Sequence, residues 1–193
     1  MLYSQEGGLF LGQQQQGRLP SCAVFPQSRP FLHGRNPRRY IICYVGRMHL
    51  FDIVKNKSCA HSYFGHTKAV RDVQFAHSGK NFLSCGFDNR VLNWDTEYGK
   101  VNATFNLKRI PFTLKYHPSE YNPHIFLCGS SSRKIYQFDL RTGAKTMEYN
   151  QHLGTVNTLT FIEENKFVSS SDDKKLFIWE YGVPVVTRHV SEP

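Results

Sequence analysis

The chain has 193 residues, of which 40% are hydrophobic and 20% charged, and its formal net charge at pH 7 is +9. These proportions are ordinary for a folded domain, and no apolar run approaches the roughly 20 residues that cross a bilayer, so we expect no contact with a membrane. The positive charge permits an anionic partner such as RNA or an acidic protein surface, and a generally basic solvated surface explains it equally well.

Residues 1–39 contain a glutamine run at 13–16, scattered glycine and proline, and a basic stretch formed by Arg35, Arg38 and Arg39. Such a composition indicates a disordered or unassigned N-terminal segment. An arm that contacts RNA is the alternative interpretation of the arginines.

An aromatic residue followed by an acidic one recurs along the rest of the chain, at Phe51-Asp52, Trp94-Asp95, Phe138-Asp139 and Trp179-Glu180. The spacings between successive pairs are 43, 44 and 41 residues, and each of the last three pairs ends an alternating, strand-like run. A period of about 40–45 residues with this ending is typical of propeller blades. The predicted fold is therefore all-β, a partial WD-repeat β-propeller of about three and a half four-stranded antiparallel blades over residues 40–193.

The same phase gives the boundaries of the blades. Residues 40–64 are predicted to form only the final two strands of an earlier blade, and the complete blades cover about 65–107, 108–150 and 151–193. In the first complete blade we expect strands at about 70–76, 81–86, 90–95 and 101–105, because alternating runs there are separated by turn residues.

Two blades repeat a set of four polar and aromatic residues: His66, Ser84, Asp88 and Trp94, and then His152, Ser169, Asp173 and Trp179. A Ser-His-Asp set invites comparison with the catalytic triad of hydrolases. However, a second copy of a nucleophile adds little to an enzyme, and neither serine lies in a Gly-x-Ser-x-Gly turn. These residues instead resemble the structural tetrad of WD-repeat propellers, which implies a buried hydrogen-bonded chain across each blade.

The middle blade departs from this pattern. Phe138 replaces the tryptophan, Ser132 the aspartate and Cys128 the serine, while Leu107 falls near the histidine position. We therefore expect this blade to depend on apolar packing alone.

The cysteines are widely spaced and form no Cys-x-x-Cys pair: Cys22, Cys43, Cys59, Cys85 and Cys128. This pattern predicts neither a zinc site nor a redox motif, and it favours the reducing nucleus or cytosol. No phosphate-binding loop, metal-ligand cluster or paired carboxylates occur either, so we expect no enzyme activity, no cofactor and no small-molecule substrate.

From about Ser62 to Pro193, two thirds of the chain, the sequence resembles the pre-mRNA-processing factor 17 family of second-step splicing factors. The resemblance rests on FGHTKAVRDVQF, on NWDTEYGKV and on EYNQHLGTVNTLTFIEENKFVSSSDDKKLFIWEYGVPV. It implies a non-catalytic scaffold of the spliceosome, located in the nucleus, with spliceosomal proteins and also snRNA or pre-mRNA as candidate partners. A generic WD-repeat adaptor, such as a ubiquitin-ligase substrate receptor or a chromatin-complex subunit, is the alternative function.

Propellers of the resembled family have seven blades and continue past the final Ser-Glu-Pro of this chain. We therefore expect a fragment, a truncated form or a divergent relic, whose uncovered blade faces favour association.

Partners of such propellers often bind around the mouth of the central channel. The candidate contact residues there are Arg71, Phe87, Phe112, Asn157 and Asp172, with Ser131 at the corresponding position of the middle blade. Aromatic and arginine side chains fit the composition of binding hot spots, although exposed residues at loop edges explain them too. A basic rim is expected nearby for RNA phosphate, formed by Lys68, Lys108, Arg109, Arg133, Lys134, Lys174 and Lys175.

Overall fold

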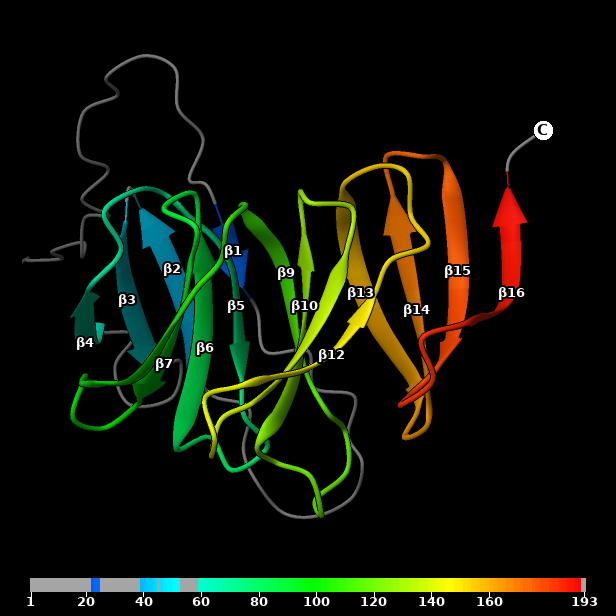
Figure 1. Cartoon of the computed structure of the whole chain (residues 1–193). Helices are drawn as coiled ribbons and strands as arrows, with labels where there is room; N and C mark the ends of the chain where they lie inside the picture. Colours follow the sequence, from blue (N-terminus) through cyan, green and yellow to red (C-terminus); the bar gives the residue numbers. More distant parts are fainter. Residues whose placement is uncertain (1–21, 25–38, 45, 53–58, 192–193) are drawn as a thin grey trace, which may run out of the picture.

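The structure is a computed structural model that describes residues 22–24, 39–44, 46–52 and 59–191. These residues form sixteen strands in four antiparallel sheets, which stand side by side in chain order (Figure 1). Within the described ranges no helix has the length and apolar character that a membrane span needs. The fold is a partial WD-repeat β-propeller, and each sheet is one blade.

Each sheet is a meander in which strands adjacent in sequence pair with one another. The first two sheets consist of β1 (Cys22–Val24), β2 (Arg39–Tyr44), β3 (Arg47–Asp52), β4 (Cys59–Phe64), β5 (Val70–Phe75), β6 (Asn81–Gly86), β7 (Arg90–Asp95) and β8 (Val101–Asn106). The last two consist of β9 (Pro111–Tyr116), β10 (Ile125–Ser130), β11 (Ile135–Asp139), β12 (Lys145–Tyr149), β13 (Val156–Glu163), β14 (Lys166–Ser171), β15 (Lys175–Glu180) and β16 (Val186–Ser191).

The first sheet differs from the prediction, because it has four strands where the sequence predicted the last two of a blade. β2 pairs with β3 over its whole length, and Cys22 of β1 pairs with Cys43 of β2. Two features hid these strands: β1 has only three residues, and the apolar residues of β2 are consecutive rather than alternating. The glutamine run at 13–16, Arg35 and Arg38, on which the predictions of disorder and of an RNA-contacting arm rest, lie outside the described residues.

A meander places alternate connections at opposite ends of the sheets. The segments that follow β4, β6, β8, β10, β12 and β14 lie along one end, which we call the upper edge, as it appears in Figure 1. The segments that follow β5, β7, β9, β11, β13 and β15 form the opposite, lower edge.

Three apolar cores hold the four sheets together, one between each pair of neighbours. The first core joins Met48 and Tyr63 of the first sheet to Val73 of the second. The corresponding cores of the second and third boundaries are equally closed to solvent, with Leu114 and Leu159 essentially buried. We call the row of four sheets the arc. Since apolar burial is the main favourable contribution to folding, the stability of the arc comes largely from these boundaries.

A stacked pair of aromatic rings from two central strands occupies each core. The pairs are Phe82 with Trp94 (ring centroids 5.9 Å apart), Phe126 with Phe138 (5.3 Å) and Phe167 with Trp179 (6.0 Å). In every case the two residues are also register partners across the antiparallel ladder. The aromatic residue that closes each repeat in the sequence is therefore one half of a cross-strand stack.

A third aromatic ring reaches each pair from the outer strand of the preceding sheet. These rings are Tyr63 against Phe82 (4.9 Å), Phe105 against Phe126 (5.3 Å) and Tyr149 against Phe167 (5.1 Å), all meeting edge to face. Edge-to-face contact is favourable because the positive ring edge meets the negative ring face. Each blade boundary is thus fastened by a ring that the preceding blade supplies.

The two tyrosines add a polar contact that the phenylalanine lacks. The Tyr63 hydroxyl donates to the carbonyl of Thr96 in the next sheet (2.7 Å), and the Tyr149 hydroxyl accepts from the amide of Gly182 (3.1 Å). Nearer the inner strands of the middle boundary, the Asp72 carboxylate accepts from the amide of Leu114 (2.8 Å). Burial raises the pKa of Asp72, although the hydrogen bond from the Leu114 amide opposes this rise.

The far face of the fourth sheet has no neighbouring sheet among the described residues. Val190 occupies the register position of the outer-strand aromatic rings, since it pairs with Leu176 as Tyr149 pairs with Ile135. Val190 is 60% exposed and Leu176 44%.

We predict that Phe105→Ala lowers the free energy of unfolding by roughly 3–5 kcal/mol, because it removes a ring from a closed core and leaves a cavity. The control is Phe64→Ala, whose ring is 64% exposed and contacts Arg47, and it should cost at most about 1 kcal/mol. Equilibrium denaturation in urea measures both values, and equal losses would contradict the boundary role of Phe105.

Candidate functional site

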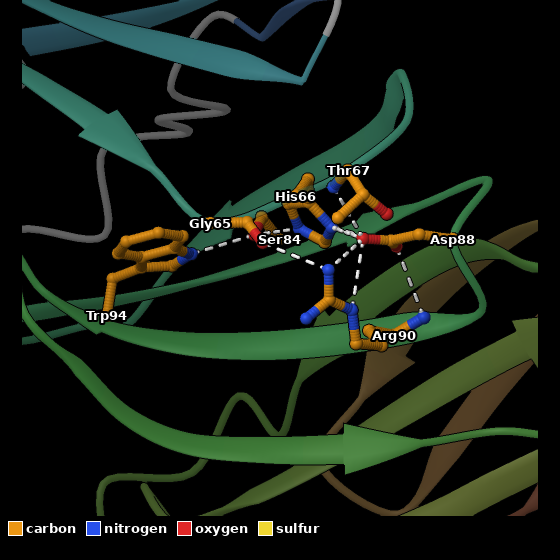
Figure 2. Close-up of polar contacts among 7 residues, drawn as sticks. All are labelled: Gly65, His66, Thr67, Ser84, Asp88, Arg90 and Trp94. Atoms are coloured by element: carbon orange, nitrogen blue, oxygen red, sulfur yellow. Dashed lines mark hydrogen bonds and ion pairs between the residues drawn. The ribbon is translucent and has the colours of Figure 1, made fainter.

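The structure brings the four repeated residues of the second sheet into one hydrogen-bonded chain (Figure 2). Trp94 Nε1 lies 2.8 Å from Ser84 Oγ, which lies 2.7 Å from His66 Nε2, and His66 Nδ1 lies 2.9 Å from an Asp88 carboxylate oxygen. The chain runs from the aromatic core to the upper edge, where Asp88 occupies the turn between β6 and β7.

Burial lowers the pKa of His66 and so favours the neutral imidazole, for which the donors and acceptors fit only one direction of proton donation. An indole N–H can only donate, so Ser84 accepts from Trp94 and its own hydroxyl proton goes to His66 Nε2. His66 then carries its proton on Nδ1 and donates it to Asp88. All four buried groups are satisfied by a neutral imidazole in a single tautomer.

Asp88 is the end of the chain and receives further donors. The backbone amide of Thr67 donates to it at 3.0 Å, and the Arg90 guanidinium does so at 2.8 Å while also reaching the carbonyl of Gly65 (Figure 2). Burial alone would raise the pKa of Asp88, but the bonds from His66, Thr67 and Arg90 outweigh it, so the pKa lies below its ordinary value.

The fourth sheet repeats the arrangement. Trp179 donates to Ser169 at 2.7 Å, Ser169 lies 2.6 Å from His152, and His152 lies 2.9 Å from Asp173. The amides of Leu153 and Lys175 also donate to Asp173. Burial works to raise the pKa of Asp173, and the bonds from Leu153, His152 and Lys175 bring it below its ordinary value.

The third sheet has no such chain at the equivalent positions. Cys128 is fully buried in the apolar core, and Ser132 bonds to the hydroxyl of Tyr136 at 2.9 Å. Leu107 packs against the same core at the register position of the two histidines. Apolar contact takes the place of the polar chain in this blade.

Neither serine of the two Ser-His-Asp sets is accessible to a substrate. Ser84 and Ser169 are both 0% exposed, and each hydroxyl already accepts from an indole. A nucleophilic hydroxyl has to face its substrate. Among the described residues no cluster of three or more His, Cys, Asp or Glu side chains is placed to hold a metal ion.

The candidate contact residues lie at equivalent positions of the upper edge. The amides of Phe87, Ser131 and Asp172 each donate to the carbonyl three residues beyond the histidine position, at 3.0, 2.9 and 3.0 Å. Arg71 and Phe112 follow the first residue of β5 and β9, and Asn157 follows that of β13.

These candidates form two separate groups. The Arg71 guanidinium lies over the Phe112 ring, 5.2 Å from its centroid, and Phe87 meets the same ring edge to face at 6.2 Å. We call Arg71, Phe87 and Phe112 the aromatic corner. In the fourth sheet, Asn157 Nδ2 instead donates to the Asp172 carboxylate at 2.6 Å.

The sequence did not predict the contacts of several residues at the upper edge. Arg90 was not predicted to bind Asp88, and the only signal was its position two residues after the turn aspartate. Leu153 is 69% exposed beside the second tetrad. Lys134 forms an ion pair with Glu148 and is therefore not an open site for phosphate, contrary to the predicted basic rim.

Known proteins resemble a large part of this chain. The model of the family described as WD domain, G-beta repeat matches residues 57–95 and 143–180. Pre-mRNA-processing factor 17 from Mus musculus and from Homo sapiens is 40% identical over 148 residues, which cover 76% of this chain and 26% of either relative. The Saccharomyces cerevisiae protein of that name is 33% identical over 147 residues, covering 74% of this chain and 32% of the relative. The chain thus spans about a quarter to a third of the length of these relatives.

We predict that Asp88→Ala lowers the free energy of unfolding by roughly 3 kcal/mol or more, because it leaves a buried histidine and an arginine without their acceptor. The same loss is expected for Asp173→Ala. Ser132→Ala is the matched control in the third sheet and should cost less than about 1 kcal/mol. Thermal and urea denaturation provide the comparison, and an unchanged Asp88→Ala melt would contradict the role of the chain in stability.

We also predict that acid weakens the fold in two ranges of pH. Burial holds the pKa of His66 below its ordinary value of 6.5, so the unfolded chain binds the proton first and stability falls as the pH drops below that value. The pKa of Asp88 is also lowered, so a further loss begins as the pH falls below the ordinary value of 3.8. Urea denaturation between about pH 7.5 and 5 should show the first loss.

In that first range His66→Gln should have a shallower dependence on pH than the unchanged chain. A remaining slope is expected from His117, whose pKa burial also lowers. An identical slope in both proteins would contradict the neutral state of His66.

Proposed function

Because the chain carries WD repeats on an arc of propeller blades and is similar to pre-mRNA-processing factor 17, we propose that it is a non-catalytic scaffold of the spliceosome that acts in the second step of pre-mRNA splicing. The observation that carries the proposal is the 40% identity over 148 residues with relatives of that name. The closed Ser-His-Asp sets support a binding function, since their reactive atoms are used within each blade. This function places the chain in the nucleus, without a small-molecule substrate.

The proposed contact surface for spliceosomal proteins is the aromatic corner. Phe87 is 37% exposed and Arg71 is exposed, while Phe112 holds both in place by ring contacts. Aromatic and arginine side chains that are held in position lose little freedom on binding, which suits a hot spot. Asn157 and Asp172 belong to the same edge and offer polar contacts beside it.

Direct contact with snRNA or pre-mRNA is part of the proposal, since the upper edge also carries lysine and arginine residues. The alternative function, a generic WD-repeat adaptor of a ubiquitin ligase or of a chromatin complex, requires different partners. Partner identity therefore separates the two functions.

We predict that the tagged chain recovers splicing proteins from nuclear extract, and that Arg71→Ala combined with Phe87→Ala reduces this recovery several-fold. Arg71 is exposed and Phe87 is 37% exposed, and each loses only a ring contact with Phe112 that is worth about 1 kcal/mol, so the variant should stay folded with a slightly lower melting temperature. The control is Tyr121→Ala, which removes an aromatic ring that is 91% exposed at the lower edge. Mass spectrometry identifies the partners.

Recovery of ubiquitin-ligase or chromatin subunits in place of splicing proteins would favour the adaptor function. Equal recovery by the unchanged chain and the double variant would contradict the aromatic corner as the contact surface.

A further inference from the structure

The two edges of the arc differ in charge. The six segments of the upper edge contain six cationic residues and three aspartates: Lys68, Lys108, Arg109, Arg133, Lys134 and Lys174 against Asp88, Asp172 and Asp173. The six segments of the lower edge are balanced, with Lys80, Lys100 and Arg141 against Glu97, Glu120 and Glu164. The terminal residues of the adjoining strands increase the difference, since Arg90 and Lys175 lie at the upper edge, whereas at the lower edge Asp95, Asp139, Glu163 and Glu180 outnumber Lys145 and Lys166.

Each aspartate of the upper edge is already occupied by donors of its own sheet. Asp88 accepts from His66 and Arg90, Asp173 from His152, and Asp172 from Asn157. Most of the cationic residues of the upper edge, by contrast, have no such partner. Lys134 pairs with Glu148. The other five cationic residues of the six upper-edge segments make no side-chain hydrogen bond or ion pair with any part of the chain that the structure describes. They are Lys68, Lys108, Arg109, Arg133 and Lys174. We call these five residues the cationic arc.

Two members of the cationic arc occupy a backbone conformation that does not suit them. Arg133 and Lys174 have φ of 68° and 60°, at the turn position that Asn89 fills in the second sheet with φ of 63°. Asparagine and glycine adopt this left-handed region at less cost than residues with long side chains. Long cations at a position better suited to asparagine point to a use for their charge outside the fold.

The aromatic corner lies at the same edge as the cationic arc. Arg71 covers the Phe112 ring, and Phe87 presents an exposed ring beside it. A guanidinium plane and an aromatic face are the surfaces on which unpaired bases stack, and spaced cations follow a phosphate backbone. The cations come from four different segments along the arc, which suits a linear polyanion rather than a compact ligand.

Resting on the proposed function in splicing, we propose that the upper edge is a binding site for single-stranded RNA. The cationic arc contacts successive phosphates, and one base stacks on Phe87 or on the Arg71 guanidinium. Sequence preference is weak, because stacking and phosphate contacts read no base edges.

The test measures fluorescence anisotropy of a labelled oligouridine of about 12 nucleotides with the full chain. Arg133→Asn combined with Lys174→Asn should weaken binding roughly tenfold at low salt, and the slope of log affinity against log salt should fall by about 0.7 for each lost phosphate contact. The same variant should melt at an unchanged or higher temperature, because asparagine suits the turn. Phe87→Leu keeps an apolar side chain that cannot stack and should also weaken binding.

The matched control is Lys80→Asn combined with Lys100→Asn, which removes the same charge from the lower edge and should leave RNA affinity nearly unchanged. Equal weakening by both double variants would show a response to net charge alone and would overturn the inference. Absence of RNA binding at low salt would do the same. Oligoglutamate binding that matches RNA, with Phe87→Leu without effect on either, would assign the edge to acidic peptides instead.

The outcome separates this inference from the proposed function. If the unchanged chain binds no RNA but still recovers splicing proteins from extract, the RNA site and the proposed RNA contact are overturned, and the scaffold function through protein partners stands. RNA binding at the upper edge without recovery of splicing proteins overturns only the splicing function.

Discussion

A β-sheet has to bury its apolar face against another element, and in this chain an aromatic ring from the outer strand of one sheet covers the ring pair of the next. The rest of the structure depends on this contact. Trp94 is buried in the core where Tyr63 meets its ring edge to face at 5.7 Å, and a buried indole N–H requires an acceptor, which Ser84 provides. The polar chain from Ser84 through His66 to Asp88 follows from that requirement.

The direction of proton donation from Trp94 through Ser84 to His66 also explains why a set of residues typical of hydrolases has a structural function here. In a hydrolase the histidine takes the serine proton when the substrate is attacked. Here Ser84 accepts from an indole and donates to His66, so its oxygen lies inside the fold with its hydrogen bonds made. The same residue types therefore support opposite functions, and the exposure of the hydroxyl distinguishes them.

The sequence predicted what the local repeat determines and missed what depends on distant partners. The spacing of Trp94 and Trp179, with histidine and aspartate in phase, placed both hydrogen-bonded chains, because each lies within one blade. The outer-strand rings Tyr63, Phe105 and Tyr149 were missed, because their partners belong to the following blade. Lys134 was assigned to the basic rim for the same reason, since its partner Glu148 lies on another strand.

The outer-strand rings are chemically alike but not equal, and this difference affects how the arc opens. The hydroxyls of Tyr63 and Tyr149 form hydrogen bonds with the following sheet, whereas Phe105 contacts the following sheet by its ring alone. Repeat arrays come apart at their weakest junction, and each side remains a cooperative unit. The seam between the second and third sheets has no such hydrogen bond at its outer strand, while the Leu114 amide donates to Asp72 nearer its inner strands, so this seam would loosen from the outside inward and the amides of β8 would exchange with solvent before those of β5 and β9.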